Sequence, residues 1–216
     1  MNARSKRPAG KGRPGNHRKQ RPAKAKKKSS IDVNQLTQKA TEKPEVKFYK
    51  AERSFSQMPL KAQLLKAIAN KGFSEPTEIQ DKTLEPLLQG RDLMGVAQTG
   101  TGKTIAFLVA TFHYLLSKAD DDNSGNSKGA NPAGPRAMIM APTRELAVQI
   151  EAEFRLFSQG MGLFSTLCIG GASMGRQIDN LRKKPEFVIG TPGRLIDLER
   201  QRKINFNSFS AIVLDE

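Results

Sequence analysis

The sequence predicts an α/β fold built on a parallel sheet with helices on both faces. From residue 137 onward, short apolar runs alternate with segments of helical periodicity. The apolar runs lack polar alternation, which is typical of strands buried on both faces of a parallel sheet. A glycine-rich turn ending in Gly-Lys-Thr precedes a long helical stretch, as the phosphate-binding loops of such folds do.

The helices and strands follow from the apolar periodicity and from the residues that end each segment. Before the glycine-rich turn we expect two helices, with apolar faces over residues 60–68 and 79–88 and ends at Gly72 and Gly90, and then a strand over residues 93–97. A long helix begins at Lys103 and runs to about residue 117, and residues 119–135 are rich in turn formers and should form an exposed loop. Beyond this loop we expect strands over residues 138–141, 164–169, 187–189 and 211–214, and helices over residues 144–157, 174–183 and 194–201.

Charge is distributed unevenly along the 216 residues. Residues 1–30 contain 12 Lys and Arg and no Asp or Glu, whereas residues 31–216 carry 24 Lys and Arg against 21 Asp and Glu. Because residues 1–30 lack apolar periodicity, we expect a disordered basic tail that contacts nucleic acid, with a solubilising tail or a nuclear address as the alternatives. We place the tail and a polar linker at residues 1–54 and the folded domain at residues 55–216.

Several classes of protein are excluded by composition. One cysteine, Cys168, rules out an intramolecular disulfide framework, and two histidines argue against a His-based metal site. The longest apolar run, residues 104–116, is too short to span a bilayer, and no apolar stretch follows the basic N-terminus. We therefore expect no membrane partner and a cytoplasmic location, or a nuclear or nucleolar one if the source is eukaryotic.

Residues 97–104, Ala-Gln-Thr-Gly-Thr-Gly-Lys-Thr, have the chemistry of a triphosphate site. Gly100 and Gly102 allow a tight turn whose N–H groups point inward, and the N-terminus of the following helix also attracts anions. Lys103 can reach the β- and γ-phosphates, and Thr104 can place its hydroxyl on Mg²⁺. Alanine replaces the usual first glycine, where only a small residue is needed; an incidental glycine-rich helix start is the alternative.

Two carboxylates, Asp215 and Glu216, directly follow the apolar residues 211–214. Asp215 would hold Mg²⁺, directly or through water, and Glu216 would orient and deprotonate an attacking water. Strands often end in acidic residues, but about 110 residues after a phosphate loop the pair becomes specific. We therefore expect Lys103, Asp215 and Glu216 to be catalytic, and Thr104 and Asp215 to bind the metal.

Six short motifs, in order across residues 55–216, resemble those of the DEAD-box RNA helicases. They are Phe55 with GFSEPTEIQ (72–80), AQTGTGKT (97–104), PTREL (142–146), GG (170–171), TPGR (191–194) and VLDE (213–216). The resemblance implies a first RecA-like helicase domain, ATP and Mg²⁺ as cofactors, and RNA as a partner. It also implies a chain truncated within the last motif and without the second RecA-like domain, so that the 216 residues alone would not unwind RNA.

Roles for individual residues follow from this resemblance. Phe55 would stack on adenine and Gln80 would hydrogen-bond its edge, although Thr77 and Gln80 also fit a capping box, and both can hold. The phosphates would contact the loop residues Gln98, Thr99, Gly100, Thr101, Gly102, Lys103 and Thr104. The RNA backbone would contact Arg144, Gly171, Thr191, Gly193 and Arg194. For Thr191 the alternative is plain helix initiation, and for Arg144 a surface charge.

We therefore expect the ATP-binding half of an ATP-dependent RNA helicase. The alternative from a different class is a non-catalytic nucleic-acid-binding protein in which the tail binds and the phosphate loop is vestigial. A GTPase with a phosphate loop is disfavoured because no guanine-reading Asn-Lys-x-Asp motif is present and Gln80 indicates adenine.

Overall fold

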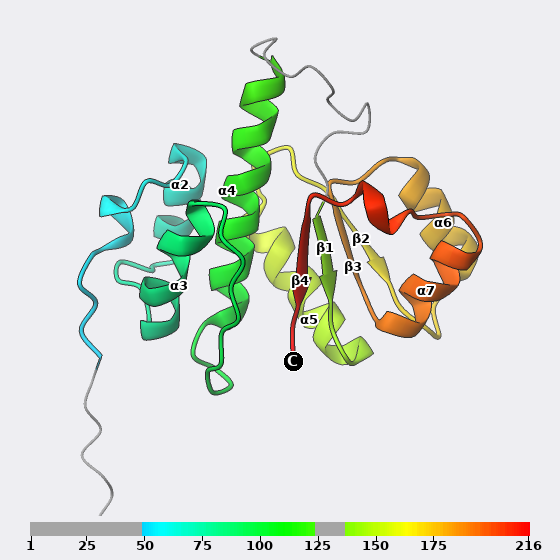
Figure 1. The fold of residues 1–216 in the computed structure, drawn as a ribbon, viewed down its shortest axis with the longest axis horizontal. Helices are drawn as coiled ribbons and strands as arrows, with labels where there is room; N and C mark the ends of the chain where they lie inside the picture. Colours follow the sequence, from blue (N-terminus) through cyan, green and yellow to red (C-terminus); the bar gives the residue numbers. More distant parts are fainter. Residues whose placement is uncertain (1–48, 124–136) are drawn as a thin grey trace, which may run out of the picture. The chain divides into compact units, whose positions relative to one another are not determined.

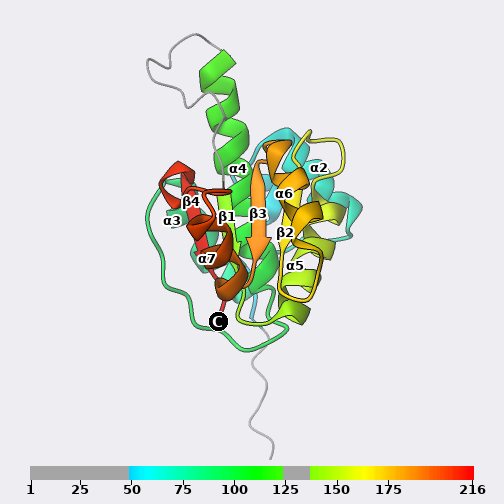
Figure 2. The same ribbon diagram turned by 90° about the vertical axis from the view of Figure 1, so that its right-hand side faces the viewer.

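Four parallel strands form the sheet in the computed structural model, which describes residues 49–123 and 137–216. Their order is β2 (Ser165–Cys168), β3 (Phe187–Gly190), β1 (Ala137–Met140) and β4 (Ala211–Leu214). Figure 2 shows this order across the sheet, with β4 and β2 at its two edges. In the register of the central strands, Ile139 lies opposite Ile189 on one side and Val213 on the other. The predicted parallel sheet is confirmed.

Helices cover both faces of this sheet, because each central strand sends alternate residues into two separate cores. Ile139 and Phe187 join one core with residues of α4 and α5, whereas Met138 and Val188 join the other with residues of α7. In the first core, Phe112, Phe154 and Phe187 pack edge-on, with ring centroids 4.8–5.2 Å apart. The four helices are α4 (Lys103–Asn123), α5 (Arg144–Phe157), α6 (Met174–Arg182) and α7 (Pro192–Arg200).

Two further helices, α2 (Ala62–Asn70) and α3 (Glu78–Leu88), lie on the side of α4 that faces away from the sheet (Figure 1). Glycines in the left-handed conformation follow each of them, Gly72 with φ +76° and Gly90 with φ +76°, as predicted. Two short 3₁₀ helices, η1 (Phe55–Gln57) and η2 (Phe206–Ser208), were not predicted. Within residues 49–123 and 137–216, no helix combines the length and apolarity that a membrane span needs.

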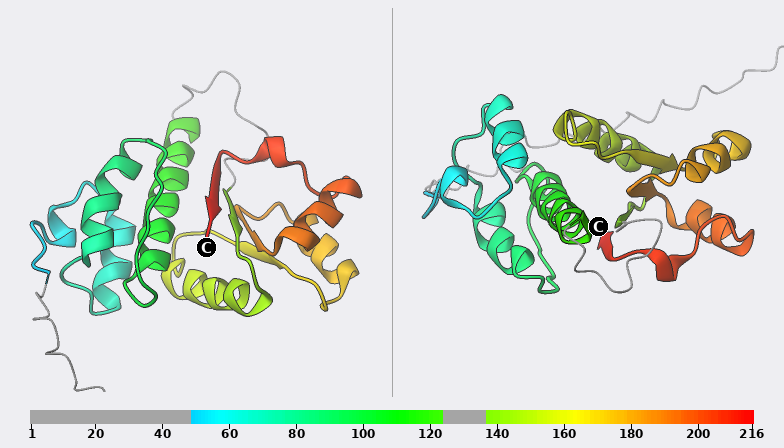
Figure 3. Two further views of the ribbon diagram at one scale, coloured as in Figure 1. Left: turned by 60° about the horizontal axis from the view of Figure 1, so that its bottom comes forward. Right: turned by 90° about the horizontal axis from the view of Figure 1, so that it is seen from above.

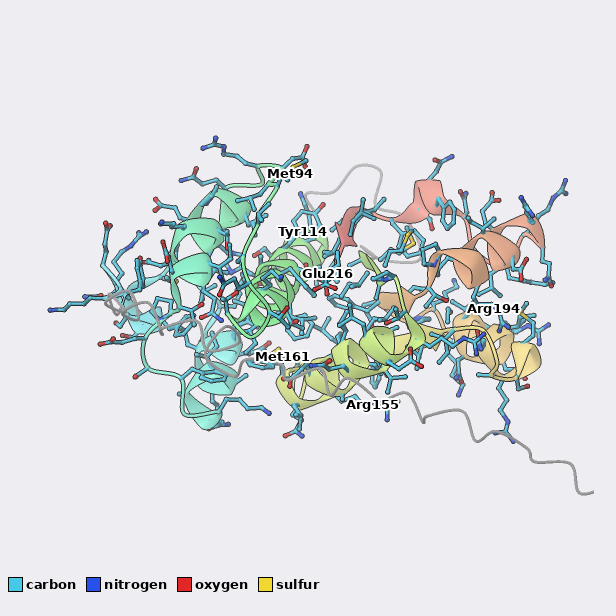
Figure 4. The ribbon with its side chains drawn as sticks, turned by 90° about the horizontal axis from the view of Figure 1, so that it is seen from below. Met94, Tyr114, Arg155, Met161, Arg194 and Glu216 are labelled. Atoms are coloured by element: carbon cyan, nitrogen blue, oxygen red, sulfur yellow. The ribbon has the colours of Figure 1, made fainter. Side chains whose placement is uncertain are left out.

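Two predictions about the elements are wrong. Residues 93–97 form no strand, and Met94 and Val96 are 95% and 94% exposed. No described strand pairs with this segment, and an apolar run becomes a strand only by pairing. Figure 4 shows Met94 at the periphery. Helix α4 also continues through residues 119–123, which were expected in the loop, because no glycine or proline interrupts the chain from Lys103 to Asn123. The tail and residues 124–135 lie outside the described residues.

Candidate functional site

The carboxyl ends of all four strands meet at one edge of the sheet, and most of the predicted site residues follow these ends. Because the strands are parallel, Arg144 after β1, Gly171 after β2, Thr191 after β3 and Asp215 after β4 are brought to the same edge. Ligands of open α/β sheets bind in this position. The fold thus gathers motifs that are widely separated in the sequence.

The glycine-rich turn leads directly into α4. Gly100 and Gly102 have φ values of +82° and +91°, which only glycine adopts readily. Helix α4 begins at Lys103, so its first N–H groups, which have no partner within the helix, lie at the turn. Thr101 Oγ1 donates a hydrogen bond to the Gln98 carbonyl oxygen at 2.7 Å, which closes the turn. This backbone has the form that an anion site requires.

Lys103 lies between the turn and the acidic end of β4. Its Nζ donates a hydrogen bond to the Ala97 carbonyl oxygen at 2.6 Å and is 3.9 Å from Glu216 Oε1. Burial raises the pKa of Asp215 and the neighbouring Glu216 raises it further, while Lys103 opposes both effects. Figure 3 shows the C-terminal end of β4 beside α4, and Figure 4 labels Glu216 there. The three residues predicted to be catalytic are therefore brought together.

The donors at this point suit Mg²⁺. Asp215 and Glu216 offer carboxylate oxygens and Thr104 a hydroxyl oxygen, and Mg²⁺ prefers oxygen ligands. Among the described residues no group of three or more His, Cys, Asp or Glu side chains is arranged to hold a metal ion. This donor set fits an ion held by one or two carboxylates together with phosphate oxygens and water rather than by an all-protein cage.

Gln80 connects α3 to the phosphate loop. The side chain is only 4% exposed; its Oε1 accepts a hydrogen bond from the Thr77 N–H at 2.9 Å, and its Nε2 donates to the Gly102 carbonyl oxygen at 3.1 Å. A Cβ atom at Gly102 would lie 2.5 Å from this Nε2, which is a second reason for glycine there. The predicted capping box is present, and the adenine contact stays a prediction.

Phe55 is buried beside this region. Its ring is 3% exposed and joins the core that contains Met58 and Leu60, while its N–H donates to the Ser74 carbonyl oxygen at 3.4 Å. The ring therefore presents almost no free face to a base, and its stacking role stays a prediction. Its visible role is to fix η1 against the segment that precedes α3.

A short strap, residues 49–53, lies against α3, although the sequence analysis assigned it to the linker. Tyr49 Oη donates to Asp81 Oδ2 at 2.6 Å, the Glu52 N–H donates to the same oxygen at 3.0 Å, and Arg53 pairs with Glu85 at 2.6 Å. The Tyr49 hydrogen bond and the Glu52 N–H lower the pKa of Asp81, against the effect of burial, and the same hydrogen bond raises the pKa of Tyr49 to about 12. The strap fixes α3 at the residue next to Gln80.

Arg144 lies over two glycines in the loop between β2 and α6. Cβ atoms built at Gly170 and Gly171 would lie 2.9 Å from Arg144 Nη2 and 2.6 Å from Nη1, respectively. Thr143 caps α5 by accepting a hydrogen bond from the Leu146 N–H at 3.3 Å, which fixes the start of the helix that carries Arg144. A pocket of about 400 Å³ lies here, lined by Pro142, Thr143, Arg144, Glu145 and Thr191.

The start of α7 meets the same loop. Arg194 Nη1 donates to the Ala172 carbonyl oxygen at 3.4 Å, and the Thr191 N–H donates to the Cys168 carbonyl oxygen at 3.1 Å. Apart from its chain neighbours and the backbone of α7, no described residue lies within 4 Å of the position that a Cβ would take at Gly193, so this side of the residue is open. Figure 4 labels Arg194 beside α6 and α7. All five residues predicted to contact RNA therefore lie along this edge of the sheet.

One residue of this region was missed by the sequence analysis. Gln177 in α6 is 5% exposed, and its Nε2 donates to the Ile169 carbonyl oxygen at 2.9 Å, directly before Gly170. The sequence could have indicated it, because Gln177 lies at a position that shares the buried face of α6 with Ile178 and Leu181, and a polar residue on a buried face needs a hydrogen-bond partner.

The model of the DEAD/DEAH box helicase family matches residues 77–216. The chain belongs to the DEAD/DEAH box helicase family. Curated relatives include the ATP-dependent RNA helicase RhlB of Proteus mirabilis, 45% identical over 170 residues, which are 79% of this chain and 38% of the relative. The RhlB of Salmonella paratyphi B is 47% identical over 171 residues, with 79% and 39% covered. This helicase-family chain thus spans about two fifths of the length of these relatives.

Solved structures of the family are similar to this helicase-family chain as well. A DEAD box protein from Methanococcus jannaschii superposes with a TM-score of 0.65 at 31% identity, covering 76% of this chain and 41% of that one. A hypothetical ATP-dependent RNA helicase from Sulfolobus tokodaii gives a TM-score of 0.61 at 29% identity, covering 71% and 40%. The predicted RecA-like fold and the DEAD-box resemblance are confirmed.

Proposed function

We propose that this chain is the ATP-binding half of an ATP-dependent RNA helicase. The observation that carries the proposal is the approach of Lys103 Nζ to within 3.9 Å of Glu216 Oε1, which joins the phosphate loop to the acidic strand end. Membership of the DEAD/DEAH box family and the printed names of the relatives support ATP and RNA as ligands.

Different residues of the chain bind the phosphates, the metal ion and the adenine of the nucleotide. Lys103 exchanges the Ala97 carbonyl oxygen for the β- and γ-phosphates, and Glu216 orients the attacking water and accepts its proton. Thr104 and Asp215 hold Mg²⁺, which when bound neutralises charge on the phosphates. The other loop residues, which offer backbone N–H groups to the phosphates, are Gln98, Thr99, Gly100, Thr101 and Gly102. Gln80 recognises the edge of adenine, and Phe55 stacks on the base once its ring, which is 3% exposed here, becomes accessible.

For RNA, we propose sequence-independent binding through the sugar-phosphate backbone. Arg144 and Arg194 supply charge, while Gly171, Thr191 and Gly193 supply backbone and hydroxyl groups at a helix N-terminus and an open loop. The basic tail, residues 1–30, adds electrostatic affinity. For the 216 residues, which span about two fifths of the length of the curated relatives, the proposal is limited to binding of nucleotide and RNA.

Substitution of Lys103 tests this function. We expect Lys103→Ala to weaken binding of MgATP, titrated with a fluorescent ATP analogue, by about tenfold or more, because a charged contact to phosphate is lost. Affinity for single-stranded RNA should stay largely unchanged. Lys66→Ala, at an exposed position of α2, is the matched control and should leave both affinities unchanged. If Lys103→Ala changes neither affinity, the phosphate loop is vestigial and the tail-binding alternative is favoured.

A further inference from the structure

Side chains from three different helices lie against the loop between β2 and α6, and two of them hydrogen-bond its carbonyl oxygens. Gln177 of α6 binds the Ile169 carbonyl oxygen, Arg144 of α5 lies over Gly170 and Gly171, and Arg194 of α7 binds the Ala172 carbonyl oxygen. Two of these side chains are cations that the proposed function assigns to RNA. The other side chain, Gln177, and the glycine under the guanidinium, Gly170, have no assigned role.

Gly170 provides the space in which the Arg144 guanidinium lies. A Cβ atom there would lie 2.9 Å from Nη2 and 3.3 Å from both Cζ and Nε, closer than van der Waals contact allows. Unlike Gly171, with φ +78°, Gly170 is not in the left-handed region, so its backbone tolerates alanine. The three atoms nearest to a new methyl group there all belong to the end of the flexible Arg144 side chain. The residue is thus required by the position of the guanidinium rather than by the backbone.

Gln177 fixes the position of the same loop relative to α6. Gln177 is 5% exposed, and its Nε2 donates a 2.9 Å hydrogen bond to the carbonyl oxygen of Ile169, the residue before Gly170. Burial of a glutamine costs free energy that its hydrogen bonds offset; Nε2 is bonded here, whereas Oε1 is buried without a hydrogen-bond partner among the described residues. Its hydrogen bond therefore ties the loop to α6 and sets the surface on which Arg144 rests.

We propose that Gly170 and Gln177 are positioning residues of the RNA-backbone site: Gly170 makes room for the Arg144 guanidinium, and Gln177 holds the loop beneath it. This inference rests on the proposed function, because it assumes that Arg144 contacts RNA phosphate. Neither residue touches RNA in this account. Each acts through Arg144, so their effects on binding depend on the arginine being present.

A double-mutant cycle in the full 216-residue chain tests the role of Gly170. We expect Arg144→Ala and Gly170→Ala each to weaken binding of a short oligouridylate by about tenfold, measured by fluorescence anisotropy, because each removes one charged contact. The double variant should bind no more weakly than Arg144→Ala, since the methyl group then has nothing to displace. Each variant should also lower the magnitude of the slope of log affinity against log salt by about 0.7, the value for one phosphate contact to a single strand.

Gly175→Ala is the matched control, since a Cβ there meets only Ser173 Oγ, at 4.0 Å; its affinity and salt slope should equal those of the parent. If Arg144→Ala binds like the parent, the proposed role of Arg144 fails and the inference fails with it. If Arg144→Ala weakens binding but Gly170→Ala does not, or if their losses add in the double variant, only the inference is overturned. Thermal unfolding of each variant establishes that the fold is kept.

For Gln177, the variant Gln177→Met removes the hydrogen bond at nearly unchanged side-chain volume. We expect it to weaken oligouridylate binding several-fold and to speed amide hydrogen exchange at residues 170–172, because the loop loses its anchor. In the Arg144→Ala background the substitution should no longer affect binding. Unchanged affinity in the parent background, or an equal loss in both backgrounds, would overturn the role of Gln177.

Discussion

Gln80 offers a direct test of how the phosphate loop is supported. Its side chain is 4% exposed and makes two hydrogen bonds, one from the Thr77 N–H and one to the Gly102 carbonyl oxygen. Gln80→Leu keeps most of the volume and removes both. Loss of the cap at Thr77 costs about 1 kcal/mol. The Gly102 oxygen still accepts from the Ala106 N–H, so loss of the second hydrogen bond costs about 1 kcal/mol more.

We therefore expect the free energy of unfolding of Gln80→Leu to fall by about 2 kcal/mol, which for a domain of this size lowers Tm by roughly 4–8 °C. The assay is urea and thermal unfolding without nucleotide. Gln80→Glu keeps an acceptor for Thr77 but turns a carboxylate oxygen toward the Gly102 carbonyl oxygen at a buried position, so it should cost at least as much as Gln80→Leu.

Gln149→Leu, at an exposed position of α5, is the control and should leave the free energy of unfolding within about 0.5 kcal/mol of the parent. A change as small as this in Gln80→Leu would refute the reasoning, because it would mean that Gln80 does not join α3 to the loop in solution.

Three further predictions concern stability, each measured by urea unfolding. Gly190→Ala should cost about 1–3 kcal/mol, because a Cβ there would overlap the Cys168 carbonyl oxygen of the paired strand; an unchanged midpoint would contradict the β2–β3 packing. Gly175→Ala, in the first turn of α6, should stabilise the chain by about 0.4–1 kcal/mol, because alanine has less freedom to lose on folding and its Cβ meets Ser173 Oγ only at 4.0 Å; a loss of stability would contradict this. Asp81→Asn should destabilise near neutral pH but not in strong acid: the lowered pKa of Asp81 gives stability above its unfolded value of ~3.9 that disappears as pH falls through the folded value. An equal effect of Asp81→Asn on the free energy of unfolding in neutral and in acid solution would contradict the strap geometry. The stability that Tyr49 adds through its raised pKa is present below its unfolded pKa of ~10 and is lost as pH rises through about 12.

Local signals predicted most of the fold. Helix α5 begins and ends as predicted, at Arg144 and Phe157, because Thr143 caps it and its apolar positions keep one period. The segment at residues 93–97 could not be predicted in this way: its composition favours a strand, but strand formation depends on a partner elsewhere in the chain. The end of α4 was missed because the polar residues after Ser117 carry no apolar period, yet nothing breaks the helix there.

Some features of the candidate site were likewise predicted from the sequence, and others were not. Motif spacing predicted that Lys103, Asp215 and Glu216 come together. Asp215 and Glu216 follow β4, at the edge where the parallel strands end, whereas Lys103 begins α4 after a segment that forms no strand. The anchoring of the loop by Gln177 could not be predicted, because that contact depends on the packing of α6. The burial of Phe55 likewise follows from tertiary packing that no local pattern reports.

The most direct test of the whole account is a crystal structure of the chain with a non-hydrolysable ATP analogue and Mg²⁺. We predict the phosphates against residues 98–104, Lys103 Nζ moved from the Ala97 carbonyl oxygen to a phosphate oxygen, and Asp215 facing the metal. A nucleotide bound elsewhere, or a loop that stays closed with Lys103 on Ala97 at saturating ligand, would contradict it.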